Sequence, residues 1–252
     1  MMLWLRSLGF NIYLYTMTAL VAVLASPAML ISEPATYRVM RLWSQLVNIG
    51  LRRICNIRIE IRGQEYLPAN RPALIACKHQ SMWDTIIFLS LLPKPVYILK
   101  KELGLIPFFG WYTIRTGMVR VDREGHASAL KKMIADSKRC IAAGKTLVIF
   151  PEGTRAPAGE KLEYKPGIAA LYHQLGVGCV PAALNSGLFW PRRQFLRPAG
   201  TIILEFLPPI APGLNRRDFM ATLEENIEAA TVRLLAEAQR NREKHNVNIL
   251  LA

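Results

Sequence analysis

Residues 73–84 read Ala-Leu-Ile-Ala-Cys-Lys-His-Gln-Ser-Met-Trp-Asp, an apolar run that passes directly into polar residues. The run Ala73–Cys77 has the length and composition of a short buried strand. Ser81 is a good N-cap residue, so we expect a helix to begin near it and His79 to lie in the turn between the two elements. A strand that leads within a few residues into a helix is typical of α/β folds.

Strand patterns of the same kind recur along the chain, with helical patterns between several of them. Ile57–Ile61 alternates with period two, and the other apolar runs are Val96–Leu99, Met118–Val121, Thr146–Phe150, Cys179–Leu184 and Thr201–Leu207. Amphipathic helices are predicted at Ala127–Ala143, with Gly144 as the C-cap, and at Arg217–His245. We therefore predict an α/β fold, a central mixed β-sheet flanked by helices, in residues 50–252, preceded by a helical segment of residues 1–49.

The composition restricts the class of partner. The chain has 252 residues, 52% of them hydrophobic, and a net charge of +14. A charge of this sign indicates nucleic acid, anionic lipid or a phosphorylated substrate, and no nucleic-acid-binding motif accompanies it, so we expect no nucleic acid partner. The four cysteines form no Cys-x-x-Cys pair, which argues against a zinc site, and we expect them to be reduced, in a reducing compartment.

The N-terminal region is apolar enough to enter a membrane. No charged residue occurs from Ser7 to Ser32, and Leu8–Ile31 is long enough to cross a bilayer as a helix. Ser26-Pro27 interrupts that run, so two helices that dip as a hairpin into one leaflet are an alternative to a span. The same run is also compatible with a cleaved signal peptide, with Val23-Leu24-Ala25 as the cleavage site, and with a buried helix.

Positive charge follows the apolar segment. Five arginines precede the next acidic residue after Glu33: Arg38, Arg41, Arg52, Arg53 and Arg58. Positive charge on this side favours a retained membrane anchor whose following residues stay in the cytoplasm. We interpret the arginines as a basic collar on anionic lipid, although a solvated helix face produces the same pattern.

His79 and Asp84 can form a catalytic pair. In a straight helix their side chains would point about 140° apart, but a strand-to-helix turn lets Asp84 reach back to the ring of His79. The pair would then be a general base with an orienting carboxylate, and the attacking hydroxyl would come from the substrate. The spacing alone is also compatible with His79 as a hydrogen-bonded structural residue, which is common for a histidine at a strand end.

A second candidate site follows another predicted strand, in Phe150-Pro151-Glu152-Gly153-Thr154-Arg155. Ligands of α/β sheets gather at the carboxyl ends of strands, Gly153 allows a close approach of the backbone, and Arg155 suits phosphate. A surface turn with an exposed arginine would have the same sequence. Residues 100–111, with paired lysines and an apolar, proline-broken surface, and residues 117–123 are interpreted as a wall that faces phosphate and acyl chain, or as a basic loop and a strand.

The order of these segments resembles the glycerophospholipid acyltransferase family, and within it the bacterial 1-acyl-sn-glycerol-3-phosphate acyltransferases. The pair His79 and Asp84 is similar to the family's first motif and Phe150–Arg155 to its third, which is the most specific. Gly117–Arg123 resembles the second motif, although Arg120 stands where the family usually has an apolar residue. Val180-Pro181-Ala182 resembles the fourth motif, and Lys165-Pro166-Gly167 a stretch that precedes it. The resemblance covers about residues 40–215.

This resemblance implies transfer of a fatty acyl group from a thioester to the sn-2 hydroxyl of lysophosphatidic acid, which gives phosphatidic acid. It implies His79 and Asp84 as catalytic residues, no metal and no tightly bound cofactor. The substrate-binding residues that it implies are Lys100, Arg123, Glu152, Gly153, Thr154 and Arg155. The donor would be acyl-CoA or an acyl carrier protein thioester, and anionic membrane lipid a further partner, at the inner membrane with the site facing the cytoplasm. An acyltransferase for another lyso-lipid, such as an amino-acid-linked one, and a non-enzymatic basic membrane-binding protein are two competing hypotheses.

Overall fold

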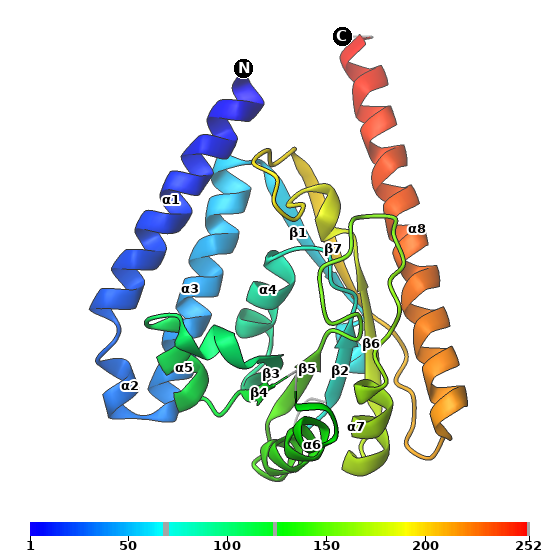
Figure 1. Cartoon of the computed structure of the whole chain (residues 1–252). Helices are drawn as coiled ribbons and strands as arrows, with labels where there is room; N and C mark the ends of the chain where they lie inside the picture. The colour runs from blue at the N-terminus through cyan, green and yellow to red at the C-terminus, as the bar shows by residue number, and fades with distance from the viewer. Residues whose placement is uncertain (68–70, 123–124, 251–252) are drawn as a thin grey trace.

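The computed structural model describes residues 1–67, 71–122 and 125–250, and its centre is a seven-stranded sheet within these residues (Figure 1). The strands are β1 (Ile57–Arg62), β2 (Leu74–Cys77), β3 (Pro95–Lys100), β4 (Val119–Val121), β5 (Thr146–Ile149), β6 (Cys179–Leu184) and β7 (Gly200–Phe206). Their order is β1-β7-β6-β2-β5-β3-β4, and all neighbours are parallel except β6 and β7, which are antiparallel. The predicted mixed sheet is confirmed, and each predicted strand is found within one residue of its expected ends.

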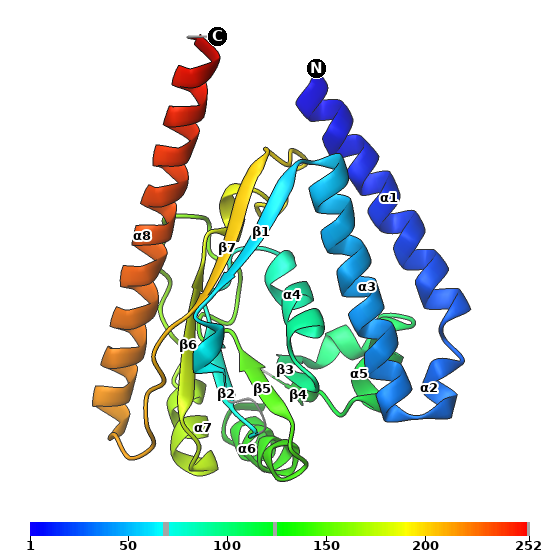
Figure 2. The same ribbon diagram turned by 180° about the vertical axis from the view of Figure 1, so that it is seen from behind.

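Helices cover both faces of the sheet (Figures 1 and 2). One layer contains α1 (Met2–Leu24), α2 (Ala28–Ile31), α3 (Glu33–Ile54), α4 (Trp83–Leu91) and α5 (Phe109–Arg115). The other contains α6 (His126–Ala142), α7 (Gly167–Leu175) and α8 (Arg216–Leu250). Short 3₁₀ turns are η1 (Gln64–Tyr66), η2 (Lys101–Leu105) and η4 (Ser186–Leu188). Three clusters of buried apolar side chains among the described residues hold the helices on the sheet, one chiefly for the first layer and two for the second.

The predicted helices α6 and α8 are confirmed, and Gly144 ends α6 as expected. Its φ of +70° lies in the left-handed region, and its N–H donates to Ile141 O at 3.0 Å. The predicted apolar helix over Leu8–Ile31 is not one straight helix, because α1 ends at Leu24 and α2 begins after Pro27.

The helices α1 and α3, joined through α2, form an antiparallel pair that we call the N-terminal hairpin (Met2–Ile54). Gly50 lets the two helices approach closely, since a Cβ there would lie 2.3 Å from the ring of Tyr13. Tyr13 Oη donates to Leu46 O at 2.9 Å, and Trp43 Nε1 donates to Thr18 Oγ1 at 2.9 Å. The two helices are therefore one packed unit. Because α3 continues to Ile54, the division between residues 49 and 50 stays a prediction.

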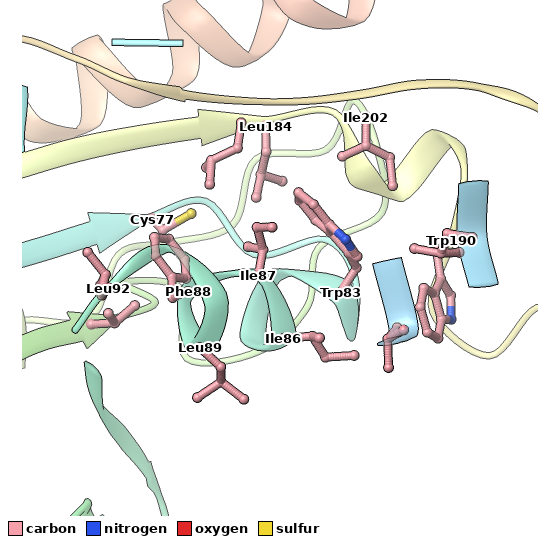
Figure 3. Packing of buried hydrophobic residues seen from close by; sticks show 14 of the residues in the cluster. Cys77, Trp83, Ile86, Ile87, Phe88, Leu89, Leu92, Leu184, Trp190 and Ile202 are labelled. Atoms are coloured by element: carbon pink, nitrogen blue, oxygen red, sulfur yellow. The ribbon is translucent and has the colours of Figure 1, made fainter. Parts of the chain in front are cut away.

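The helix α4 carries the catalytic candidate Asp84 and is fixed by its apolar face. Trp83, Ile86, Ile87 and Phe88 are buried against the sheet and the N-terminal hairpin (Figure 3). Trp83 Nε1 also donates to Asn48 Oδ1 on α3 at 2.9 Å. Consecutive helical residues point about 100° apart, so the anchored Trp83 turns the Asp84 side chain away from this apolar contact.

Candidate active site

The candidate site lies where the carboxyl ends of three neighbouring strands meet. The parallel strands β5, β2 and β6 are adjacent in the sheet. His79 follows β2, the turn Phe150–Arg155 follows β5, and Ser186 follows β6. The sheet thus brings the first and third motifs together with a residue that follows the fourth, at the edge where α/β sheets bind ligands.

The structure brings His79 and Asp84 into contact, as the strand-to-helix turn predicts. His79 Nδ1 lies 2.9 Å from Asp84 Oδ2, and both residues are screened from water, Asp84 completely. α4 begins at Trp83, slightly later than expected, and Ser81 Oγ accepts from Trp83 N at 3.1 Å. The shift keeps Asp84 in the first turn of the helix, from which its carboxylate reaches back to His79.

The carboxylate of Asp84 is held from four directions. Its Oδ2 accepts from Gln80 N at 2.7 Å and Ser81 N at 2.8 Å in addition to the His79 ring, and its Oδ1 accepts from Ser186 Oγ at 2.5 Å. Because Oδ2 already acts as an acceptor, we assign the proton to Nδ1 of His79, which leaves Nε2 as the acceptor nitrogen of a neutral ring. Ser186 was not anticipated from the sequence.

The ring and backbone of His79 are also fixed. The ring stacks on Phe150 with centroids 4.1 Å apart, and Phe150 in turn lies nearly parallel to Tyr97. The N–H of His79 donates to Glu152 Oε2 at 2.9 Å, and its carbonyl accepts from Ala156 N at 2.8 Å. The turn Phe150–Arg155, which we call the third-motif turn, and Ala156 directly after it therefore position both the ring and the main chain of His79.

Glu152 belongs to a buried ion network. Its Oε1 lies 2.8 Å from Lys78 Nζ, and Lys78 also contacts Glu228 Oε1 of α8 at 2.7 Å. Tyr164 Oη donates to the same oxygen of Glu228 at 2.9 Å. Burial raises the pKa of Glu152, and the Lys78 ammonium opposes that rise. Glu152 was expected among the substrate-binding residues, but its two oxygens contact Lys78 and His79.

Arg155 is half-buried beside two further arginines. Burial lowers the pKa of Arg155, with Arg192 and Arg193 lowering it further and Asp84 opposing them. Arg192 Nη1 donates to Thr154 Oγ1 at 3.4 Å, and Arg193 has a φ of +58°, which is uncommon for a residue with a side chain. Arg155 with two further guanidinium groups beside it forms a site suited to an anion. The dipeptide Arg192-Arg193 is visible in the sequence but lies outside the four motifs.

The other predicted site residues differ in position. Lys100 is exposed at the carboxyl end of β3, beyond β5 on the same sheet edge, and Thr154 is exposed in the third-motif turn. Gly153 has a φ of +67°, and its N–H donates to Phe150 O at 2.9 Å. Arg123 lies outside the described residues.

Neither a metal centre nor a cysteine nucleophile is evident in the part of the chain that the structure describes. No group of three or more His, Cys, Asp and Glu side chains is placed there to hold a metal ion. Cys77, next to the site, is buried, and burial raises the pKa of its thiol, which makes it a poor nucleophile. The His79–Asp84 pair and the arginines are therefore the candidate functional groups of this site.

Known proteins are similar to this chain in sequence and in fold. The family model described as Acyltransferase matches residues 58–185. The 1-acyl-sn-glycerol-3-phosphate acyltransferase of Pseudomonas aeruginosa is 35% identical over 206 residues, 81% of this chain and 79% of the relative. The protein of the same name from Cocos nucifera is 30% identical over 218 residues, 84% of this chain and 70% of the relative.

A solved structure agrees with the architecture. The 1-acyl-sn-glycerophosphate (LPA) acyltransferase PlsC from Thermotoga maritima superimposes with a TM-score of 0.70 at 22% identity, over 91% of this chain and 97% of that chain. This likeness shows a shared fold. The family match contains His79, Asp84 and Arg155, and the Pseudomonas relative covers most of the sequence. These two matches establish that this chain belongs to the acyltransferase family.

Proposed function

We propose that this chain transfers a fatty acyl group from a thioester to the sn-2 hydroxyl of 1-acyl-sn-glycerol-3-phosphate, giving phosphatidic acid. The observation that carries the proposal is the oriented pair of His79 and Asp84 beside Arg155, Arg192 and Arg193. The pair supplies a base for a hydroxyl, and the arginines suit an acceptor that carries phosphate. The relatives named for this reaction support the choice of substrate.

The proposed chemistry needs no enzyme nucleophile. Nε2 of His79 takes the proton of the sn-2 hydroxyl as its oxygen attacks the thioester carbonyl, and the proton then passes to the departing thiolate. The Asp84 carboxylate keeps Nδ1 protonated and stabilises the imidazolium that forms between these two steps. The four contacts to Asp84 hold it ready for this role without reorganisation.

The acceptor phosphate is assigned to Arg155, with Arg192 and Arg193 beside it. Lys100 and Arg123 remain proposed helpers. The tetrahedral oxyanion needs N–H donors, and since the N–H of Gly153 donates to Phe150 O, the following N–H groups of Thr154 and Arg155 are the candidates in this turn. We assign Glu152 to the positioning of the His79 turn, because both of its oxygens contact protein groups.

The donor is an acyl thioester, as for acyltransferases of this family. Acyl-CoA and an acyl carrier protein thioester are both compatible with the proposed chemistry, because the thiolate leaves in the same way from either. The reaction as written consumes only the two substrates and requires neither a metal ion nor a tightly bound cofactor.

The apolar helix α1 indicates membrane association. We propose that the N-terminal hairpin lies in one leaflet of the inner membrane and that the site faces the cytoplasm. The hydrogen bonds between α1 and α3 favour this arrangement over a separate transmembrane span.

Cleavage near Ser26 would remove Phe10, Leu14 and Met17, which are buried in the core, and this argues against a signal peptide. Exposed Arg38, Arg52, Arg53 and Arg58 support the basic collar, while Arg41 donates to Leu92 O.

The test is an acyl-transfer assay of purified protein with labelled thioester and a panel of lyso-lipid acceptors. The proposal expects phosphatidic acid as product, no turnover by a folded His79→Ala variant, and a raised KM for the acceptor alone in Arg155→Ala. Arg155→Lys should recover only part of this affinity, because a point charge lacks the guanidinium fork. Equal use of acceptors without phosphate would support the competing hypothesis of an acyltransferase for another lyso-lipid.

A further inference from the structure

The segment between β3 and β4 exposes an unusual amount of apolar surface. Six large side chains within twelve residues are between 38% and 83% exposed, and we call them the α5 patch: Leu103, Leu105, Ile106, Phe109, Trp111 and Ile114. Single exposed apolar residues are ordinary on a protein surface, whereas a contiguous group of this kind marks a binding surface. Part of this segment was interpreted from the sequence as a wall facing the acyl chain, yet these side chains point largely to the outside.

The exposed side chains of the α5 patch belong to a segment whose inner side is well packed. Phe108, with a φ of +61°, turns its partly buried ring toward the core, and it packs edge-to-face on Trp111 at 5.0 Å. Gly110 is packed so closely that a Cβ would lie 2.0 Å from Gly104 O. Tyr112 and Thr113, on the inner side of α5, are buried. The chain therefore uses a strained residue and a tight glycine contact to hold apolar side chains outward.

The α5 patch is continuous with the N-terminal hairpin. α5 contacts α2 and α3, and Tyr37 Oη of α3 donates to Thr116 O just after α5 at 3.3 Å. Ile31 of α2 is itself highly exposed. Three exposed cations flank the patch, Lys100, Arg115 and Arg120, while a fourth, Lys101, forms an ion pair with Asp122 at 2.5 Å. An apolar surface with a tryptophan and surrounding positive charge is typical of elements that lie in the interface of an anionic bilayer.

We propose that the α5 patch is a second membrane contact, which enters the interface of the same leaflet as the N-terminal hairpin. Two contacts from one layer of the fold fix the orientation of the body on the membrane, whereas a hairpin alone leaves it free to rotate. The departure of Arg120 from the usual family pattern fits this role, because it adds a cation beside the apolar side chains. The inference goes beyond the proposed reaction and rests on it only for the presence of a membrane at α1.

A labelling experiment tests the contact directly. The four native cysteines are buried, so an exposed cysteine introduced by Leu105→Cys can be labelled selectively with an environment-sensitive dye. The matched control is Val232→Cys, at an exposed apolar residue of α8 in the opposite helical layer. On vesicles of phosphatidylglycerol and phosphatidylcholine, the dye at 105 should shift to the blue and be quenched by a lipid-borne quencher. The same response at 232, or none at 105 on vesicles that bind the protein, would overturn the proposal.

A second pair of variants separates membrane contact from acyl binding. Leu105→Ser/Phe109→Ser should bind vesicles about tenfold or more weakly than Leu214→Ser/Val232→Ser, which removes apolar groups elsewhere. Activity should fall on vesicle substrate and match the control on detergent-dispersed substrate. Equal losses in both assays would place the side chains in the acyl site and refute the inference, as would a dimer in detergent that these substitutions dissociate. If the unmodified protein did not bind vesicles, the proposed hairpin anchor would be contradicted. If the Leu105→Ser/Phe109→Ser variant bound vesicles as tightly as its control, only the α5 patch proposal would be contradicted.

Discussion

Two carboxylates hold the His79 turn, and they do so in different ways. Asp84, from α4, contacts the ring and receives only hydrogen bonds from N–H and O–H donors. Glu152, from the third-motif turn, contacts the backbone N–H of His79 and forms an ion pair with buried Lys78. One carboxylate faces the ring that reacts, and the other faces the main chain that carries it.

The two carboxylates meet two different requirements of a general base: one stabilises the charge on the ring, and the other fixes the turn that carries it. A carboxylate that must stabilise a transient imidazolium works best without a permanent cation in direct contact, as at Asp84, whose hydrogen bonds come from backbone N–H groups, a hydroxyl and the His79 ring. A carboxylate that only fixes a turn can be neutralised by a lysine, as at Glu152, and the ion pair then links the turn to α8 through Glu228. Changes on the Asp84 side should therefore alter turnover, and changes on the Glu152 side should alter stability first.

The largest effect on turnover short of removing His79 is expected for Asp84→Asn. Three N–H groups point at Oδ2, so the asparagine carbonyl should occupy that place and its amide should face Ser186 Oγ, which can accept. The tautomer of His79 is then kept and only the charge is lost, so kcat should fall about 10³-fold with little change in KM. Steady-state kinetics on detergent-dispersed acceptor measures this.

The size of that loss discriminates between two arrangements. An asparagine that turned its amide toward His79 would impose the wrong tautomer and lower kcat by about 10⁴-fold. A folded Asp84→Asn variant with kcat within tenfold of the parent would contradict the role of the charge altogether.

On the Glu152 side, Lys78→Met should destabilise the fold. It leaves Glu152 buried without its cation and deprives Glu228 of the same partner, a loss of about 3 kcal/mol or more in the free energy of unfolding. The matched control is Lys161→Met, which removes an exposed lysine paired with Glu224 of the same helix α8 and should change the free energy of unfolding much less. Urea unfolding in detergent compares the two.

Rescue would identify the cause of that loss. Lys78→Met/Glu152→Gln removes the unpaired charge beside His79 while the amide oxygen can still accept its N–H, so part of the stability should return. Equal stability of Lys78→Met and Lys161→Met would show that the buried network does not hold the turn.

A smaller effect on turnover is expected for Ser186→Ala. Ser186 Oγ is the donor to Asp84 Oδ1, so its loss should let the carboxylate move and lower kcat about tenfold with KM unchanged. The control is Ser137→Ala, a buried serine of α6 away from the site. In an Asp84→Asn background the effect of Ser186→Ala should shrink, because the two residues act as one unit. Independent, multiplicative effects would argue for a merely structural serine.

The sequence predicted the sheet well because each strand carries its own apolar pattern and each helix its own period. It also predicted the contact of His79 with Asp84, since both residues lie in one short turn. Ser186 and Glu228 could not be predicted in this way, because they reach the site from 102 residues beyond Asp84 and 150 residues beyond Lys78. Their contacts depend on which strands are neighbours, and a local pattern does not contain the strand order. The outward position of the α5 patch likewise depends on packing against α2 and α3.

The smallest effect on the free energy of unfolding is expected at a partly exposed ion pair of α8, Arg62–Glu237. It contrasts with the buried pair Lys78–Glu228 on the same helix. Arg62 of β1 donates to both oxygens of Glu237, at 2.8 and 2.7 Å, and these hydrogen bonds lower the pKa of Glu237 from its ordinary value of 4.5. A carboxyl group whose pKa is lowered by folding stabilises the folded state above its ordinary pKa, and that contribution disappears as the pH falls through the lowered value. Glu237→Gln should therefore lower the free energy of unfolding by about 0.5 kcal/mol or less at pH 7, because the pair is partly exposed, and by nothing in strong acid. Unfolding curves from pH 7 downward, with Glu225→Gln as the control on the exposed face of α8, measure the difference. A gap between the parent and Glu237→Gln that persisted below the lowered pKa would mean that the glutamate acts through packing, and the charge of Glu237 would then not help to hold α8 on the sheet.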